Sequence, residues 1–125
     1  MFTLKHAQTY LMSLNFFFRS PVFPVIFDIG MGAACAENPS ELESYLIKYG
    51  SRNNTHGELI DMHYEGFMVI PDKLLVSPLT MKKKYSKKEL LQFCGIADPA
   101  LNQKRLDTCS KESIFILAVK ALQKN

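Results

Sequence analysis

The hydrophobic positions near the start of the chain repeat at helical spacing. Between residues 3 and 18, apolar side chains recur at alternating steps of four and three residues, namely Leu4, Ala7, Leu11, Leu14 and Phe18. This spacing predicts one buried stripe on a helix, and the Arg-Ser-Pro sequence after it favours a stop, because the residue before proline avoids helical angles. Phe16 and Phe17 fall off the stripe, so we expect the end of this helix to be buried on two sides.

The middle of the chain changes from helical spacing to alternation. Residues 22–29 are rich in β-branched and aromatic side chains and predict a strand, which Gly30 and Gly32 end. From residue 58 to residue 70 apolar and polar positions alternate, so Asp61, His63 and Glu65 are expected on one face of a strand. The proline and aspartate at positions 71 and 72 predict a turn before a further strand at residues 73–76. This region therefore predicts a β-hairpin or a three-stranded meander.

Capping residues mark the starts of the later helices. Asn38 opens a helix that we expect to stop at Gly50, and Ser86 with Glu89 forms a capping box for a short helix. A weak helical stretch follows at residues 100–108. Ser110 then precedes a final helix, whose expected buried face consists of Ile114, Leu117, Ala118, Ala121 and Leu122.

Together these elements predict one α+β domain over residues 1–125. We expect a small antiparallel sheet, made of the hairpin or meander plus one further strand, packed with about four to five helices. A chain of 125 residues and 14.2 kDa can bury enough apolar surface to fold without a disulfide or a metal. The three cysteines form an odd set without metal-finger spacing, which favours a reducing, cytoplasmic location. Residues 22–36 end in Ala-Cys-Ala like a signal peptide, but Asp28 interrupts their apolar run.

The most enzyme-like segment is VIFDIGMGAA at residues 25–34. It resembles the first motif of class I methyltransferases, in which an acid and glycines lead from a strand into a helix and approach the cofactor closely. Ala34 stands where the third glycine belongs, and the chain is too short for the remaining strand–helix units of that fold. A small nucleotide- or S-adenosylmethionine-binding enzyme using residues 28–32 stays an alternative; the favoured interpretation has no catalysis and no cofactor.

Two other clusters have a functional and a structural interpretation. Asp61, His63 and Glu65 could bind a metal or exchange protons, whereas the commoner explanation is a solvated polar sheet face. Five lysines gather around Tyr85, at positions 82, 83, 84, 87 and 88. They could contact phosphates as part of a nucleic-acid accessory protein, or line the entry to a helix.

The central sequence GELIDMHYEGFMVIPD at residues 57–72, with SPLTMK at residues 77–82, resembles small bacterial immunity proteins. The similarity is to those that protect cells carrying contact-dependent growth-inhibition toxins, and it covers about the central third of the chain. The resemblance implies a cytoplasmic, single-domain protein without catalytic activity of its own. Such a protein binds a cognate toxin, of nuclease type, and covers its active site.

Charge is distributed unevenly along the chain, although the formal total is only +3. Residues 72–125 carry eleven basic and five acidic side chains. Residues 37–65 carry six acidic and only two basic side chains. A nuclease cleft attracts phosphate and is usually basic, so an inhibitor is expected to offer it carboxylates. We therefore predict that the toxin contacts acidic residues and aromatic or histidine anchors of this region, namely Glu41, Glu43, Tyr45, Asp61, His63, Tyr64 and Glu65.

Overall fold

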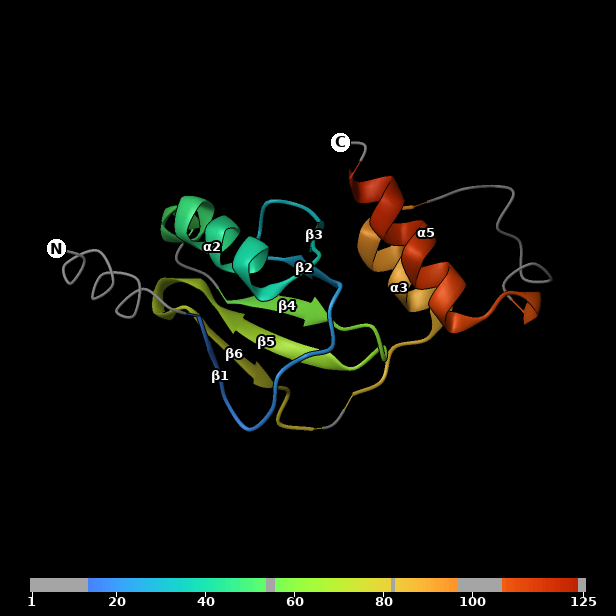
Figure 1. Ribbon diagram of the computed structural model, residues 1–125, viewed down its shortest axis with the longest axis horizontal. Helices are drawn as coiled ribbons and strands as arrows, with labels where there is room; N and C mark the ends of the chain where they lie inside the picture. The colour runs from blue at the N-terminus through green and yellow to red at the C-terminus, as the bar shows by residue number, and fades with distance from the viewer. Residues whose placement is uncertain (1–13, 54–55, 82, 97–106, 124–125) are drawn as a thin grey trace, which may run out of the picture.

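Six strands form one mixed, curled sheet, a half-barrel (Figure 1). The computed structural model describes residues 14–53, 56–81, 83–96 and 107–123. The strand order is β1-β6-β5-β4-β2-β3, and only the pairing of β1 with β6 is parallel. The strands are β1 (Asn15–Phe16), β2 (Val25–Asp28), β3 (Ala34–Ala36), β4 (Gly57–Ile60), β5 (Gly66–Ile70) and β6 (Leu75–Pro78).

Three α-helices pack on this sheet within the described residues. Figure 1 shows the first of them over one face of the sheet and the other two side by side next to β2 and β3. A single 3-10 turn joins β5 to β6. These elements are α2 (Pro39–Asn53), η1 (Pro71–Lys73), α3 (Lys87–Cys94) and α5 (Lys111–Gln123).

The pleat of the central strands sends alternate side chains to opposite faces of the sheet. Phe27 and Leu59 are fully buried in a core that includes the apolar side chains of α2. Ile26 and Ile60, one position along the same strands, are fully buried in a second core with α3 and α5. The molecule therefore has a hydrophobic core on each face of the sheet, and each such side chain contributes about 1.5–3 kcal/mol by burial.

The expected fold class is wrong in its sheet and in its number of helices. The chain forms a six-stranded mixed sheet with three described helices, where we expected a small antiparallel sheet with four to five. Part of the difference lies at the N-terminal end, where residues 15 and 16 form β1 instead of the last turn of a helix. Asn15 and Phe16 pair with Leu75 and Val76 of β6, so tertiary strand pairing overrides the local helical pattern. The earlier part of that predicted helix, and residues 100–106, lie outside the described residues.

Several predicted boundaries are confirmed. The hairpin around Pro71 forms, with η1 between β5 and β6. Ser86 and Glu89 make both hydrogen bonds of the capping box. The final helix buries Ile114 and Ala118 fully, whereas the other three residues of its expected face are half-buried.

The predicted stop at Gly50 is wrong, because α2 continues to Asn53. A Cβ atom at Gly50 would lie 2.5 Å from Cβ of Pro71, so this glycine permits close packing between α2 and η1. Its function is a close approach between two elements, not a left-handed helix end. The start of the same helix agrees with the prediction, since the side chain of Asn38 accepts a hydrogen bond from the backbone N–H of Glu41.

Candidate functional site

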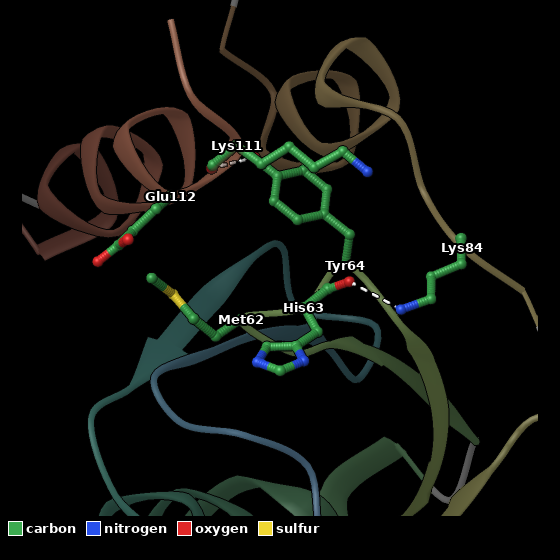
Figure 2. Close-up of a pocket in the computed structure, with 6 residues that line it drawn as sticks. All are labelled: Met62, His63, Tyr64, Lys84, Lys111 and Glu112. Carbon is green, nitrogen blue, oxygen red and sulfur yellow. Dashed lines mark hydrogen bonds between the residues drawn. The ribbon is translucent and has the colours of Figure 1, made fainter.

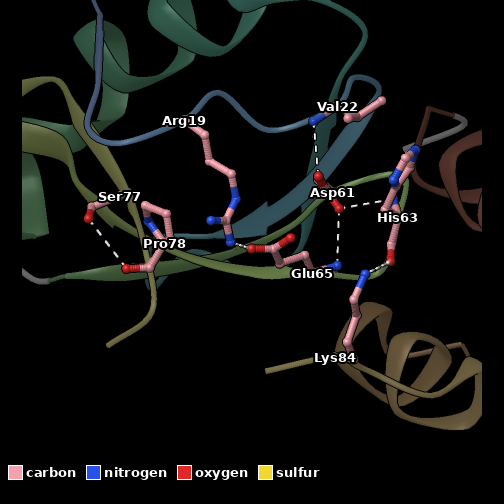
Figure 3. Close-up of polar contacts among 8 residues, drawn as sticks. All are labelled: Arg19, Val22, Asp61, His63, Glu65, Ser77, Pro78 and Lys84. Atoms are coloured by element: carbon pink, nitrogen blue, oxygen red, sulfur yellow. Dashed lines mark hydrogen bonds and ion pairs between the residues drawn. The ribbon is translucent and has the colours of Figure 1, made fainter. Parts of the chain in front are cut away.

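Asp61 is the centre of a hydrogen-bond cluster in the connection between β4 and β5 (Figure 3). Its side chain is only 3% exposed. Oδ1 accepts hydrogen bonds from the backbone N–H groups of His63 (2.9 Å) and Glu65 (3.0 Å), and Oδ2 accepts one from Val22 (3.0 Å). The carboxylate therefore shapes the turn after β4 and ties the chain entering β2 to it.

The expectation that Asp61, His63 and Glu65 share one strand face is wrong. β4 ends at Ile60, and the chain turns before β5 begins at Gly66. The backbone N–H of Asp61 donates to Glu65 O, and Tyr64 takes a positive φ of 64°. Apolar and polar residues alternate through this turn as they would in a strand. The strand is interrupted because backbone N–H groups bond to the side chain of Asp61 and not to a neighbouring strand.

Glu65 forms an ion pair with Arg19, and its side chain is largely covered (Figure 3). Arg19 belongs to the connection between β1 and β2, and its guanidinium also lies 5.9 Å from the centroid of the Phe67 ring. The same connection is held at one end by the hydrogen bond from Phe17 N–H to Val76 O, and at the other by that from Val22 to Asp61. Contacts of Phe17, Arg19 and Val22 therefore fix this connection at three points.

The fixed connection exposes two adjacent aromatic side chains, Phe17 and Phe18, which we call the aromatic finger. Phe18 is 92% exposed and Phe17 is 53% exposed, and their rings make an edge-to-face contact with 6.4 Å between centroids. Phe18 has a φ of 68°, a left-handed conformation that costs a non-glycine residue about 1 kcal/mol or more. Met81, which is 82% exposed, lies in the connection from β6 to α3. Both connections run along the bottom of the view in Figure 1.

A pocket of about 510 Å³ lies between the β4–β5 connection and the start of α5, and we call it the lysine pocket (Figure 2). Its lining residues are Met62, His63, Tyr64, Lys84, Lys111 and Glu112. The hydroxyl of Tyr64 donates to the backbone oxygen of Lys111 at 2.6 Å. Burial raises the pKa of Tyr64 to about 12, which keeps this donor protonated.

Both lysines of the pocket are held in position. The ammonium of Lys111 lies 5.3 Å from the centroid of the Tyr64 ring, a cation–π contact. Lys84 donates from Nζ to the backbone oxygen of His63 at 3.3 Å. Its backbone is placed by an antiparallel bridge to Glu65, with the hydrogen bond from Tyr85 N–H to Tyr64 O beside it. The positive charges thus sit on a structured rim.

The seven predicted contact residues divide between α2 and the connection from β4 to β5. Three of them lie on α2 and make contacts within the molecule. Glu43 accepts a hydrogen bond from Leu14 N–H, and Glu41 accepts one from Glu37 N–H. Tyr45 packs edge-to-face on Phe27, and burial raises the pKa of its hydroxyl.

The other four lie at the β4–β5 connection. Asp61, Tyr64 and Glu65 are buried there and hold the connections described above, whereas His63 is exposed. The aromatic finger was not expected as a contact surface. The available signal was the position of Phe16 and Phe17 off the helical stripe, as the first two of three consecutive phenylalanines.

The loop that resembles a methyltransferase motif has a different geometry from that motif. It joins β2 to β3, which pair antiparallel, and no helix follows it directly. The side chain of Asp28 accepts a hydrogen bond from Gly30 N–H at 2.7 Å, so the acid closes its own loop. Gly30 and Gly32 have φ values of 98° and 93°, which explains the glycines as turn residues.

Two candidates remain, a metal site and the lysine cluster around Tyr85, of which Lys82 lies outside the described residues. Over residues 14–53, 56–81, 83–96 and 107–123, no three His, Cys, Asp or Glu side chains gather as a metal site. The ammonium of Lys83 lies 4.6 Å from the centroid of the Tyr85 ring, and Lys87 donates to the backbone oxygen of Cys109. Burial raises the pKa of Cys94 to about 12 and also raises that of Cys35, so burial favours their protonated thiols.

No protein-family model, curated protein or solved structure matches this chain. A search of the described residues found no helix with the length and apolar character needed to cross a membrane.

Proposed function

We propose that this protein is an immunity-type inhibitor, which acts in the cytosol by stoichiometric binding to a cognate toxin through the aromatic finger. The observation that carries the proposal is the 92% exposure of Phe18 in a left-handed backbone conformation. An exposed phenylalanine with an unfavourable φ lowers the stability of the protein on its own, because no burial of the ring offsets the backbone strain. Burial of its ring in a partner supplies the missing stabilisation, and aromatic anchors carry much of the energy of protein interfaces.

The contacts behind the finger support this proposal. Ordering a flexible loop on binding costs free energy, and a loop that is already ordered avoids that cost. Arg19, through its ion pair with Glu65, and Val22, through its bond to Asp61, hold the connection in place before any partner arrives. The resemblance of residues 57–72 to immunity proteins supplies the class of partner, and two of those residues position the finger.

The proposal changes the electrostatic expectation for the partner. Asp61 and Glu65, which were expected to offer carboxylates to a basic cleft, are occupied within the molecule. Lys83 and Lys84 are exposed, Lys84 forms an antiparallel backbone bridge with Glu65, and the backbone oxygen of Lys83 accepts a hydrogen bond from Gly66 N–H. The toxin surface that meets the finger is therefore proposed to be an apolar socket with acidic residues around it.

The test uses the protein encoded directly upstream of this gene, the position expected for a cognate toxin. We expect its induction to stop growth, and co-expression of the wild-type chain to restore growth and to yield a one-to-one complex on size-exclusion chromatography. Phe18→Gly should weaken the complex at least about thirtyfold, as expected for a hot-spot aromatic residue, and abolish protection. A harmless neighbour, or the absence of a complex, would refute the proposal.

The matched control is Met31→Ser, which removes another exposed apolar side chain, 45% accessible, from the loop between β2 and β3. Figure 1 shows that loop at the top of the view, away from the β1–β2 connection. Met31→Ser should bind like the wild type. Phe18→Gly should stay within about 1 kcal/mol of wild-type stability, because relief of the left-handed strain offsets the lost ring contact and the greater freedom of the unfolded chain. Equal binding by both variants and the wild type would show that the finger is not the anchor.

A further inference from the structure

We propose that the lysine pocket binds a single carboxylate from an acidic segment of a partner protein. The pocket volume of about 510 Å³ falls in the range of about 300–1,000 Å³ that is usual for ligand pockets. Its walls combine an apolar part, from Met62 and the Tyr64 ring, with two ammonium groups. An acidic side chain has the same two parts, an aliphatic stem and a charged end.

The charge of the lining selects a monovalent anion. With histidine neutral, Lys84 and Lys111 contribute two positive charges and Glu112 contributes one negative charge. The net charge of +1 matches one carboxylate, whereas a phosphate dianion would leave the pocket with an excess of negative charge. Figure 2 shows the carboxylate of Glu112 on the opposite side of the pocket from the two ammonium groups, so it lowers the net charge of the lining without pairing with either lysine.

The two lysine side chains are already held in position before a ligand binds, which lowers the entropy cost of binding. A free lysine side chain loses about 2 kcal/mol of rotamer entropy when it is fixed. Here the Tyr64 ring already holds Lys111, and His63 O already holds Lys84. Part of that entropy is therefore lost on folding and not on binding.

The experiment is an NMR titration of the ¹⁵N-labelled full chain with two capped peptides, acetyl-Gly-Leu-Glu-Leu-Gly-amide and the same peptide with Gln in place of Glu. We expect saturable shifts of the His63 and Lys111 amide signals with the Glu peptide, and binding at least about fivefold weaker with the Gln peptide. Lys84→Gln and Lys111→Gln should each weaken binding of the Glu peptide about two- to fivefold, the range of an exposed ion pair.

The matched control is Lys48→Gln. Lys48 is also an exposed lysine over a tyrosine ring, 5.2 Å from the centroid of Tyr49, but it lies on α2. It should not change the affinity. The inference is overturned if the two peptides bind equally, if no saturable shifts occur, if Lys48→Gln weakens binding as much as the pocket variants, or if inorganic phosphate binds more tightly than the Glu peptide.

The lysine pocket is tested separately from the finger. Phe18→Gly should leave the affinity for the Glu peptide unchanged, because Phe18 is not part of the pocket lining. If the Glu peptide binds as expected but the toxin test fails, the pocket proposal stands and the proposed function is rejected. The reverse result would reject the pocket alone.

Discussion

Replacement of Asp61 by alanine should lower the stability of the fold by about 3–5 kcal/mol. The carboxylate is 3% exposed and accepts three backbone hydrogen bonds of 2.9–3.0 Å. Each buried donor left without a partner costs about 1–3 kcal/mol. The donors of Val22 and His63 lie at partly buried sites where water can replace some of the loss, whereas that of Glu65 is buried. The total loss is a large share of the roughly 5–15 kcal/mol by which domains are usually stable.

Urea denaturation followed by circular dichroism measures this loss. With a slope of about 2 kcal/mol per molar urea, a loss of 3 kcal/mol lowers the midpoint by about 1.5 M. Asp61→Asn should fall between the wild type and Asp61→Ala, because its amide oxygen can still accept from His63 and Glu65 while its NH₂ group faces the Val22 N–H.

The control is Asp72→Asn, since Asp72 is exposed in η1. It should stay within about 0.5 kcal/mol of the wild type, as surface substitutions usually do. Losses below about 1 kcal/mol for both Asp61 variants, or a loss of equal size for Asp72→Asn, would refute the account of Asp61 as the centre of the turn.

Two further predictions concern single hydrogen bonds. The pKa of Tyr64 is raised from 10 to about 12, so the folded state holds its proton more tightly than the unfolded state, and stability should fall as the pH rises from 10 to 12. Between pH 10 and 12 the melting temperature of Tyr64→Phe should fall less steeply than that of the wild type. An equal fall in both proteins would contradict the raised pKa of Tyr64. Ser86→Ala removes the cap of α3 and should cost about 1 kcal/mol in urea denaturation, whereas Ser86→Asp should retain most of the stability; equal losses would exclude capping as the cause.

The elements that could be predicted from sequence are those specified by neighbouring residues. The capping box at Ser86, the cap at Asn38 and the turn at Pro71 each depend on side chains within a few positions of one another. Such signals retain their meaning in any tertiary context. The strand at residues 25–28 was also predictable, because a run of large apolar side chains has to be buried on both faces.

The remaining elements depend on partners distant in the chain. β1 is only two residues long and exists because β6, about sixty positions later, supplies its hydrogen bonds. β3 reads as Ala-Cys-Ala, which has no strong strand preference, and forms by pairing with β2. Residues 58–70 retain their alternation through the turn at Asp61, so periodicity alone could not show that the strand is interrupted.

The exposure of the aromatic finger could not be predicted from sequence for a related reason. Acidic residues in a central segment look the same in sequence whether they face solvent or hold a loop, because the difference lies in the position of Val22 and Arg19. Large apolar side chains are usually buried, so the sequence pattern predicts that Phe17 and Phe18 belong to a core. Only their exposed fractions in the fold identify them as a surface.

A loss of toxin binding in a variant of Asp61 or Glu65 would therefore not locate the interface at those residues. Both side chains hold the connection that presents the aromatic finger, and a change in either one releases that connection as well as altering the local charge. Phe18→Gly is the more informative substitution, because it removes a side chain that is 92% exposed and leaves both anchoring contacts in place. If the interface were at the β4–β5 connection itself, Phe18→Gly would bind normally while Glu65 variants failed. If the finger is the anchor, Phe18→Gly fails to bind while its stability stays within about 1 kcal/mol of the wild type, since the ring that is removed is exposed.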